Sequence, residues 1–127
     1  MGNKKWEVEF YEKSDGECPT EEFLLDLEKS DKKIVVLIMK ALNRLEQYGE
    51  ALRRPYVDIL RDKIWELRVK THHGLFRLLY FFFDEEGKII VTHGISKKSG
   101  DVPDAEIEKA IEYRKDYLER KQKGKFP

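Results

Sequence analysis

The sequence predicts an α+β fold whose elements follow in the order β-α-α-β-β-β-β-α. Strand-like runs occur once near the N-terminus and four times between residues 56 and 95, whereas apolar residues recur at helical spacing between and after them. Helices segregated from an antiparallel meander are typical of the α+β class. At 127 residues, the chain is expected to form one domain, residues 1–127, with a frayed tail at 121–127.

The first strand is expected over residues 5–12, where apolar and charged side chains alternate so that one face meets the core. The apolar members are Trp6, Val8 and Phe10. We expect this strand to join an edge of the sheet.

Two helices follow and are expected to pack as a hairpin on one face of the sheet. The first begins near Thr20, which can cap it, and Ser30 and Asp31 either interrupt this helix or start the next. Residues 32–48 have the clearest helical spacing of the chain. Gly49 is a natural end for that helix, because glycine accepts a left-handed conformation without steric cost.

Four meander strands are expected at residues 56–60, 64–71, 75–83 and 88–95. The third is apolar enough to be a central strand covered on both faces, so its aromatic run is predicted to pack in the core rather than to stack on nucleobases. The turn between the first two strands contains no glycine. We therefore expect a longer loop there rather than a two-residue type I′ turn.

The last helix is expected to begin at Pro103, since proline fits the first helical position, with Asp101 upstream as a possible cap. Its apolar stripe extends to about Arg120.

Composition excludes several classes of protein. Charged residues make up 39% and hydrophobic residues 40%, which is not a disordered composition. No apolar run approaches the ~20 residues that span a bilayer, and the N-terminus lacks the apolar core of a signal peptide, so a cytoplasmic protein is expected. Cys18 is the only cysteine and is expected to be a spectator thiol.

The net charge of zero hides an asymmetry. Residues 1–50 hold 8 basic and 12 acidic residues, whereas residues 51–127 hold 17 and 13. The basic excess concentrates in residues 53–77, with 7 cations against 3 acids. This indicates either an anionic partner or a solvated face with internal ion pairs.

Cations inside strand-like runs are the most informative residues. Arg77 lies in a very apolar segment, where a buried charge is costly unless it is paired or functional. Strand alternation places Glu66, Arg68 and Lys70 on one face. If Arg68 and Arg77 share a face, their guanidinium groups can converge on a phosphate. The alternative is that Glu66 pairs Arg77 structurally.

The three histidines do not have the spacing of a zinc site, so no metal is expected. His73, in a turn beside the basic face, is a candidate for proton transfer. His93 lies within a strand and is expected to be a hydrogen-bonded structural residue.

Four motifs, in this order, resemble the phage-derived branch of the RelE/HigB toxins, the toxic halves of type II toxin–antitoxin pairs. They are W-E-L-R-V at 65–69, F-R-L-L-Y at 76–80, H-G-I-S-K-K at 93–98 and P-D-A-E-I-E-K-A at 103–110. The resemblance implies a RelE-like domain, with a helical hairpin and a C-terminal helix packed on a twisted antiparallel sheet. Lys63 stands where the turn before W-E-L-R usually has glycine.

The resemblance also implies an activity. Such toxins are mRNA interferases, endoribonucleases that enter the ribosomal A site, cut the message and inhibit translation. Cleavage needs neither metal nor other cofactor and leaves a 2′,3′-cyclic phosphate or a 3′-phosphate. By position, Arg68 and Arg77 match family arginines that stabilise the phosphate. Lys97 and Lys98 match the family's basic pair after the last strand. One of them is a candidate to stabilise the leaving group or to act as an acid.

Further RNA contacts are expected by charge and placement alone. They are Arg53, Arg54, Lys70 and His73.

The implied partner is an antitoxin, usually with a helix-turn-helix domain, which covers the toxin and represses the shared operon, so operator DNA is bound only through the complex. Two alternatives stay open: a non-catalytic module of the same fold that binds an antitoxin in operon autoregulation, and a free RNA-binding or ribosome-binding protein.

Overall fold

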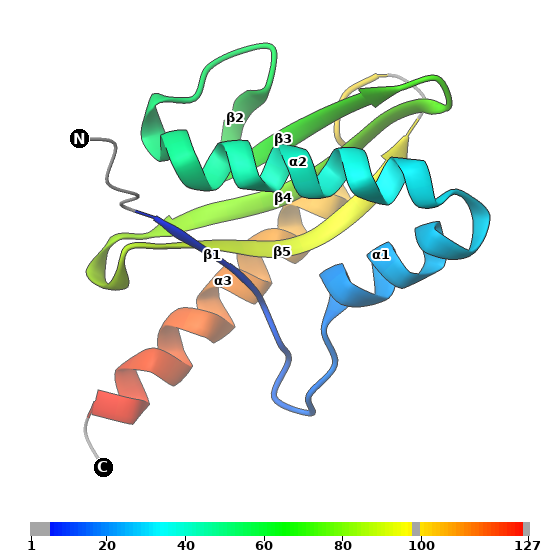
Figure 1. The fold of residues 1–127 in the computed structure, drawn as a ribbon. Coiled ribbons are helices and arrows are strands. Elements are labelled where there is room, and N and C mark those ends of the chain that lie inside the picture. The colour runs from blue at the N-terminus through cyan, green and yellow to red at the C-terminus, as the bar shows by residue number, and fades with distance from the viewer. Residues whose placement is uncertain (1–5, 98–99, 126–127) are drawn as a thin grey trace.

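The computed structural model describes residues 6–97 and 100–125 and confirms the α+β class and the expected order of elements (Figure 1). The helices and strands are β1 (Glu7–Phe10), α1 (Pro19–Ser30), α2 (Lys32–Tyr48), β2 (Val57–Arg61), β3 (Ile64–Thr71), β4 (Gly74–Phe83), β5 (Lys88–Lys97) and α3 (Asp104–Lys125). Two short 3-10 turns, Gly49–Ala51 and Asp84–Glu86, follow α2 and β4. The expected bounds of the second helix and of the 64–71 strand agree with α2 and β3.

The five strands form one sheet in the order β1-β5-β4-β3-β2. Strands β2 to β5 are the expected antiparallel meander, and β1 joins an edge, as expected. However, β1 pairs parallel with β5, with Glu7 beside Lys88 and Phe10 beside Val91, so the sheet is mixed and not purely antiparallel. No hairpin connects these two strands, and their relative direction is therefore not constrained by a tight turn.

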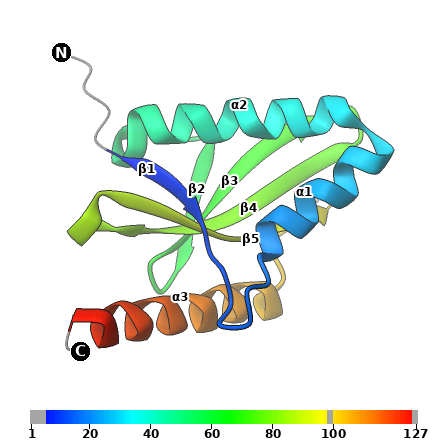
Figure 2. The same ribbon diagram turned by 60° about the horizontal axis from the view of Figure 1, so that its bottom comes forward.

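The sheet is the middle of three layers. Figure 2 shows α1 and α2 on one face and α3 across the other. One core cluster joins Ile38 and Leu45 of α2 to Leu78 of the sheet, and a second joins Phe81 to Ala110 of α3. Alternate residues of β4 enter both clusters, which confirms the central strand and the core packing of its aromatic run.

The start of α1 differs from expectation, because Thr20 does not cap the helix. The helix begins at Pro19 after Cys18, which makes no side-chain cap. The fully buried hydroxyl of Thr20 instead donates to the carbonyl of Val91 at 3.4 Å. A residue type that often caps is therefore used here to attach α1 to β5. Asp31 ends α1 and caps α2, since its carboxylate accepts from the N–H of Lys33 at 2.9 Å.

A two-residue turn connects β2 to β3, so the expectation of a longer loop is wrong. Arg61 pairs with Ile64, and the two residues between them, Asp62 and Lys63, have φ angles of 50° and 70°. Positive φ at both central residues is what a type I′ turn requires, and its twist matches that of the flanking strands. The fit to the hairpin outweighs the steric cost of a Cβ in this conformation.

The last helix is longer than expected. Residues 121–125, expected to belong to a frayed tail, continue α3. The Nζ of Lys121 lies 3.0 Å from a carboxylate oxygen of Glu86 and also lies over the ring of Tyr117. These contacts tie the end of the helix to the β4–β5 turn. Within the described ranges, no helix is long and apolar enough to cross a membrane.

Candidate functional site

Arg68 of β3 and Arg77 of β4 lie directly opposite each other in the register of the two strands. The backbone N–H of Arg68 points outward and donates to the carbonyl of Tyr56 at 2.8 Å. The two arginines therefore form a non-hydrogen-bonded pair, the type in which opposing side chains lie closer together. The two arginines therefore share one face of the sheet, which is the condition under which their guanidinium groups can converge.

Glu66 lies between the two guanidinium groups. One carboxylate oxygen is 2.7 Å from Nε of Arg77, and the other accepts a hydrogen bond from Arg68 at 3.2 Å. The side chains of Arg77 and Glu66 are only 3% and 6% exposed, whereas that of Arg68 is 33% exposed. Glu66 thus pairs with Arg77, which was the structural alternative. However, this single carboxylate faces two cations, so an excess positive charge remains.

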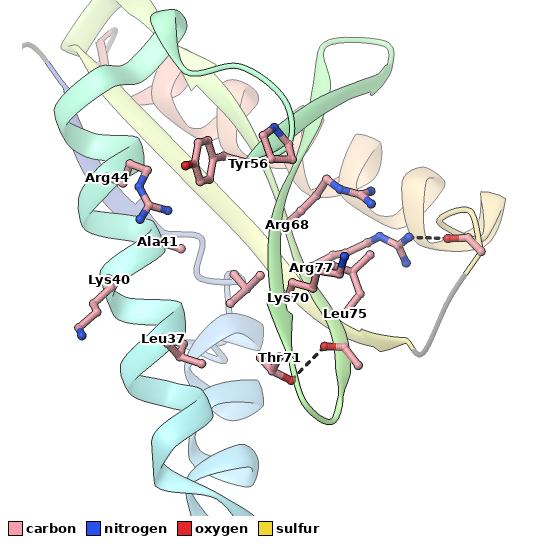
Figure 3. A pocket seen from close by; sticks show the side chains of 14 residues that line it. Leu37, Lys40, Ala41, Arg44, Tyr56, Arg68, Lys70, Thr71, Leu75 and Arg77 are labelled. Carbon is pink, nitrogen blue, oxygen red and sulfur yellow. Dashed lines mark hydrogen bonds between the residues drawn. The ribbon is translucent and has the colours of Figure 1, made fainter.

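Arg77 is not fully satisfied. Its Nη2 donates to the carbonyl of Gly100, which follows β5 (Figure 3). Its Nη1 is buried and has no hydrogen-bond partner among the described residues. A buried guanidinium N–H is costly unless it has a hydrogen-bond partner.

A pocket of about 630 Å³ lies between α2 and the outer edge of β3, and Figure 3 shows the residues around it. Its lining includes five cations and no carboxylate. The cations are Lys40, Arg44, Arg68, Lys70 and Arg77. Within the described part of the chain, Lys40, Arg44 and Lys70 have no ion-pair partner, so their charge is available to an anion.

A second hollow, of about 530 Å³, shares Arg68, Arg77 and Gly100 with this pocket and extends toward α3. Carboxylates also line it, including those of Glu66 and Asp101. Nearby, Arg61 at the end of β2 forms ion pairs of 2.6 Å with carboxylates at the start of α3. The two hollows therefore differ in charge, and only the one beside α2 is purely basic.

The other residues predicted for the site are placed less clearly. Lys97 is the last residue of β5 and pairs with Leu75, which brings its backbone close to the pocket, but Lys98 lies outside the described residues. Arg53 and Arg54 do not line the pocket, because Arg53 donates to the carbonyl of Glu50 at 2.6 Å and Arg54 pairs with Asp58 at 3.0 Å.

His73 also lies away from the pocket lining, in the β3–β4 turn. Its Nε2 is 3.4 Å from a carboxylate oxygen of Asp31, and its side chain is 67% exposed.

Sequence reasoning missed the contribution of α2 and of the segment before β2. Lys40 and Arg44 are one helical turn apart and line the pocket, and the guanidinium carbon of Arg44 lies 4.5 Å from the ring centroid of Tyr56. The sequence signal that could have revealed them is the basic i, i+4 pair itself, which lies on a helix whose apolar face was assigned to the core.

His93 is structural, as expected. Its Nε2 lies 2.9 Å from a carboxylate oxygen of Glu106, and its Nδ1 lies 3.0 Å from the hydroxyl of Thr92. Burial lowers the pKa of His93, although the Glu106 carboxylate acts in the opposite direction. Over the described residues, no three histidine, cysteine or acidic side chains come together as a metal site would require.

A comparison with protein families gives one match. The model of the family described as phage derived protein Gp49-like (DUF891) matches residues 25–115, from α1 into α3. The matched range contains every residue that lines the basic pocket. No curated protein matches the chain.

Proposed function

Because the chain belongs to the Gp49-like family, which falls in the RelE toxin superfamily and is associated with the toxins of toxin–antitoxin modules, we propose that it is a toxin that cleaves messenger RNA. The proposed target is the message in the ribosomal A site, and cleavage there stops translation. The single observation that supports this best is the basic pocket at the Arg68–Arg77 pair, because five cations without a carboxylate suit a polyanion.

In the proposed reaction, the 2′-hydroxyl of a nucleotide attacks the adjacent phosphorus. A bond from the 2′ oxygen to phosphorus forms, the bond to the 5′ oxygen breaks, and a 2′,3′-cyclic phosphate remains. The 2′ proton passes to a base, and the departing 5′ oxygen takes up a proton. Negative charge develops on the phosphorane oxygens, and cations already in place can be the largest contribution to rate.

We assign Arg68 and the buried Nη1 of Arg77 to those phosphorane oxygens, with Glu66 as the positioning residue that holds both guanidinium groups. Contact with Nη1 requires the atoms that cover it to move aside, since Nη1 is buried. Lys97, the last residue of β5, and Lys98, which follows it in the sequence, are assigned to the leaving oxygen by that position.

The remaining proposed RNA contacts fall into two groups. Lys70 lines the pocket, whereas Arg53, Arg54 and His73 would contact the message outside it. The family also implies an antitoxin partner. We propose a helix-turn-helix antitoxin that covers the toxin and carries the complex to operator DNA.

One observation favours a second candidate function. Arg77 is 97% shielded from solvent and is paired with Glu66 and with Gly100, which suits a purely structural role. A non-catalytic module that binds an antitoxin in operon autoregulation would need no more than that.

The test is mapping of 5′ ends on mRNA in a purified bacterial translation reaction. Arg68→Ala removes the more exposed guanidinium. The double variant Glu66→Met, Arg77→Met removes both buried charges together, so that no buried charge is left unpaired, although Arg68, whose side chain is 33% exposed, loses its carboxylate partner. Lys29→Ala, on the exposed surface of α1, is the matched control.

The proposal predicts cuts in A-site codons with wild type and with Lys29→Ala, and none with Arg68→Ala or the double variant. Intact message with folded, antitoxin-free wild type would favour the binding module. Undiminished cutting by both site variants would refute the assigned residues.

A further inference from the structure

The wall of the basic pocket on the α2 side combines an aromatic ring with a cation. Tyr56 is 43% exposed although it is aromatic, and the guanidinium of Arg44 lies over its ring at 4.5 Å. Leu37 and Ala41, one turn apart on α2, add an apolar surface beside it. This wall therefore offers flat π surface and apolar contact beside the charge of Arg44, and Arg68, Lys70 and Arg77 add positive charge from β3 and β4.

Tyr56 has a defined position relative to the arginine pair. Its carbonyl accepts the N–H of Arg68 at 2.8 Å, one step beyond the last β2–β3 pair of Val57 with Leu67. The ring is thus attached through the backbone to the strand that carries Arg68. Figure 3 shows the Tyr56–Arg44 pair on the α2 side of β3 and the guanidinium of Arg68 on the other side, so a ligand that contacts both passes over the edge of β3.

A nucleotide has both features that these walls match, an anionic phosphate and a flat π-faced base. Bases stack on aromatic rings and on arginine planes with little dependence on sequence. The volume of about 630 Å³ is within the usual range for small-ligand sites. Arg77, whose buried Nη1 has no hydrogen-bond partner among the described residues, also lines this pocket.

We propose that this pocket is a nucleobase subsite, in which the base of a nucleotide next to the Arg68–Arg77 phosphate site stacks on the Tyr56–Arg44 pair. The inference rests on the proposed function in taking RNA as the ligand. An acidic peptide also fits the charge. However, a docked peptide needs several apolar anchors, and of Val36, Leu37 and Met39, all exposed on α2, Leu37 alone lines the pocket.

The experiment measures fluorescence anisotropy of a short RNA whose 2′-hydroxyls are methylated, so that no nucleophile is present and the ligand is not cut. The same RNA with one abasic nucleotide, moved along its length, reports the position of the stacked base. The variants are Tyr56→Ala and Tyr56→Phe, with Arg44→Lys to keep the charge and remove the planar face. Tyr48→Ala, which changes another exposed tyrosine, on α2 and outside the pocket lining, is the control.

We expect one abasic position to weaken binding to wild type by about tenfold, the size of one lost stack. Tyr56→Ala should weaken binding of the intact RNA by a similar factor, and the abasic position should then have no further effect on binding. Arg44→Lys should reduce the difference between intact and abasic RNA, whereas Tyr56→Phe and Tyr48→Ala should bind as wild type does.

If Tyr56→Ala weakened binding of the intact and the abasic RNA by the same factor, the subsite would be refuted. Absence of RNA binding at millimolar protein would also refute it. An acidic peptide of equal charge that bound with the same dependence on Tyr56 would make the pocket a peptide site instead. Cleavage of mRNA without base-dependent binding would leave the proposed function intact and remove the subsite. If the protein bound RNA in a base-dependent way but cut no message, the subsite would stand and the proposed nuclease function would be refuted.

Discussion

The carboxylate of Glu66 lies 2.7 Å from Nε of Arg77, with both side chains almost completely buried on the α3 face of the sheet. Breaking such a pair costs more than the pair itself contributes, because it leaves one charge in the interior without a counter-charge. If the charge of Glu66 were lost, the positive charge of Arg77 would remain and would also face that of Arg68.

We therefore predict that Glu66→Gln lowers the free energy of unfolding by about 3 kcal/mol. Urea denaturation measures it. The double variant Glu66→Met, Arg77→Met should lose less than the sum of the two single methionine variants, because the charges leave together. Additive losses would show that the two side chains do not interact energetically.

Lys63 gives a stability prediction of opposite sign. Its φ of 70° costs a residue with a Cβ about 1 kcal/mol, and glycine has no such cost. Lys63→Gly should therefore raise the free energy of unfolding by about that amount. Lys63→Ala, which keeps the Cβ and removes the charge, should give no gain, and an equal gain from both variants would assign the effect to charge.

Gly94 of β5 is a site where no side chain fits. A Cβ there would lie 2.3 Å from a ring carbon of Phe23 in α1, so Gly94→Ala should destabilise the protein by about 2 kcal/mol through overpacking. In the Phe23→Leu background the same change should cost clearly less, since the ring is gone. Gly124→Ala, which meets no atom within 4 Å, is the control and should not destabilise. Thermal or urea unfolding distinguishes these outcomes.

Burial of His93 predicts a dependence of stability on pH. Because burial lowers the pKa of His93 below its ordinary value near ~6.5, the unfolded chain takes up a proton that the folded chain resists. The free energy of unfolding should therefore fall as pH drops below about 6.5. His93→Gln should flatten this part of the urea-denaturation profile, whereas the exposed His72→Gln should not. A profile unchanged by His93→Gln would contradict the assignment.

Local patterns were sufficient for much of this fold. Alternation alone located β3, and Asp31 and Gly49 marked both ends of α2, since capping and positive φ are decided within a few residues. The type I′ turn was missed because Asp62 and Lys63 include no glycine, and there the pairing of two whole strands overrides local preference. The parallel direction of β1 depends on a partner distant in sequence, which no local pattern reports.

The candidate site was predictable only in part for the same reason. The shared face of Arg68 and Arg77 follows from alternation and register, and both are local in a meander. That Arg44 and Tyr56 join them depends on how α2 lies over the end of β3, which is a property of tertiary packing. The insertion of Glu66 between the arginines was one of two open alternatives, and sequence spacing could not choose between them.

The pairing of β1 with β5 sets the order in which a nascent chain can complete the sheet. During synthesis the N-terminal strand emerges first, yet the strand that it joins is the last of the sheet, and Gly100, which closes onto Arg77, is made later still. Contacts between such distant segments form late, because a long loop must close before they add stability. For a protein proposed to act on ribosomes, the assembled pocket thus arises only after β5 and Gly100 have left the ribosome that makes them.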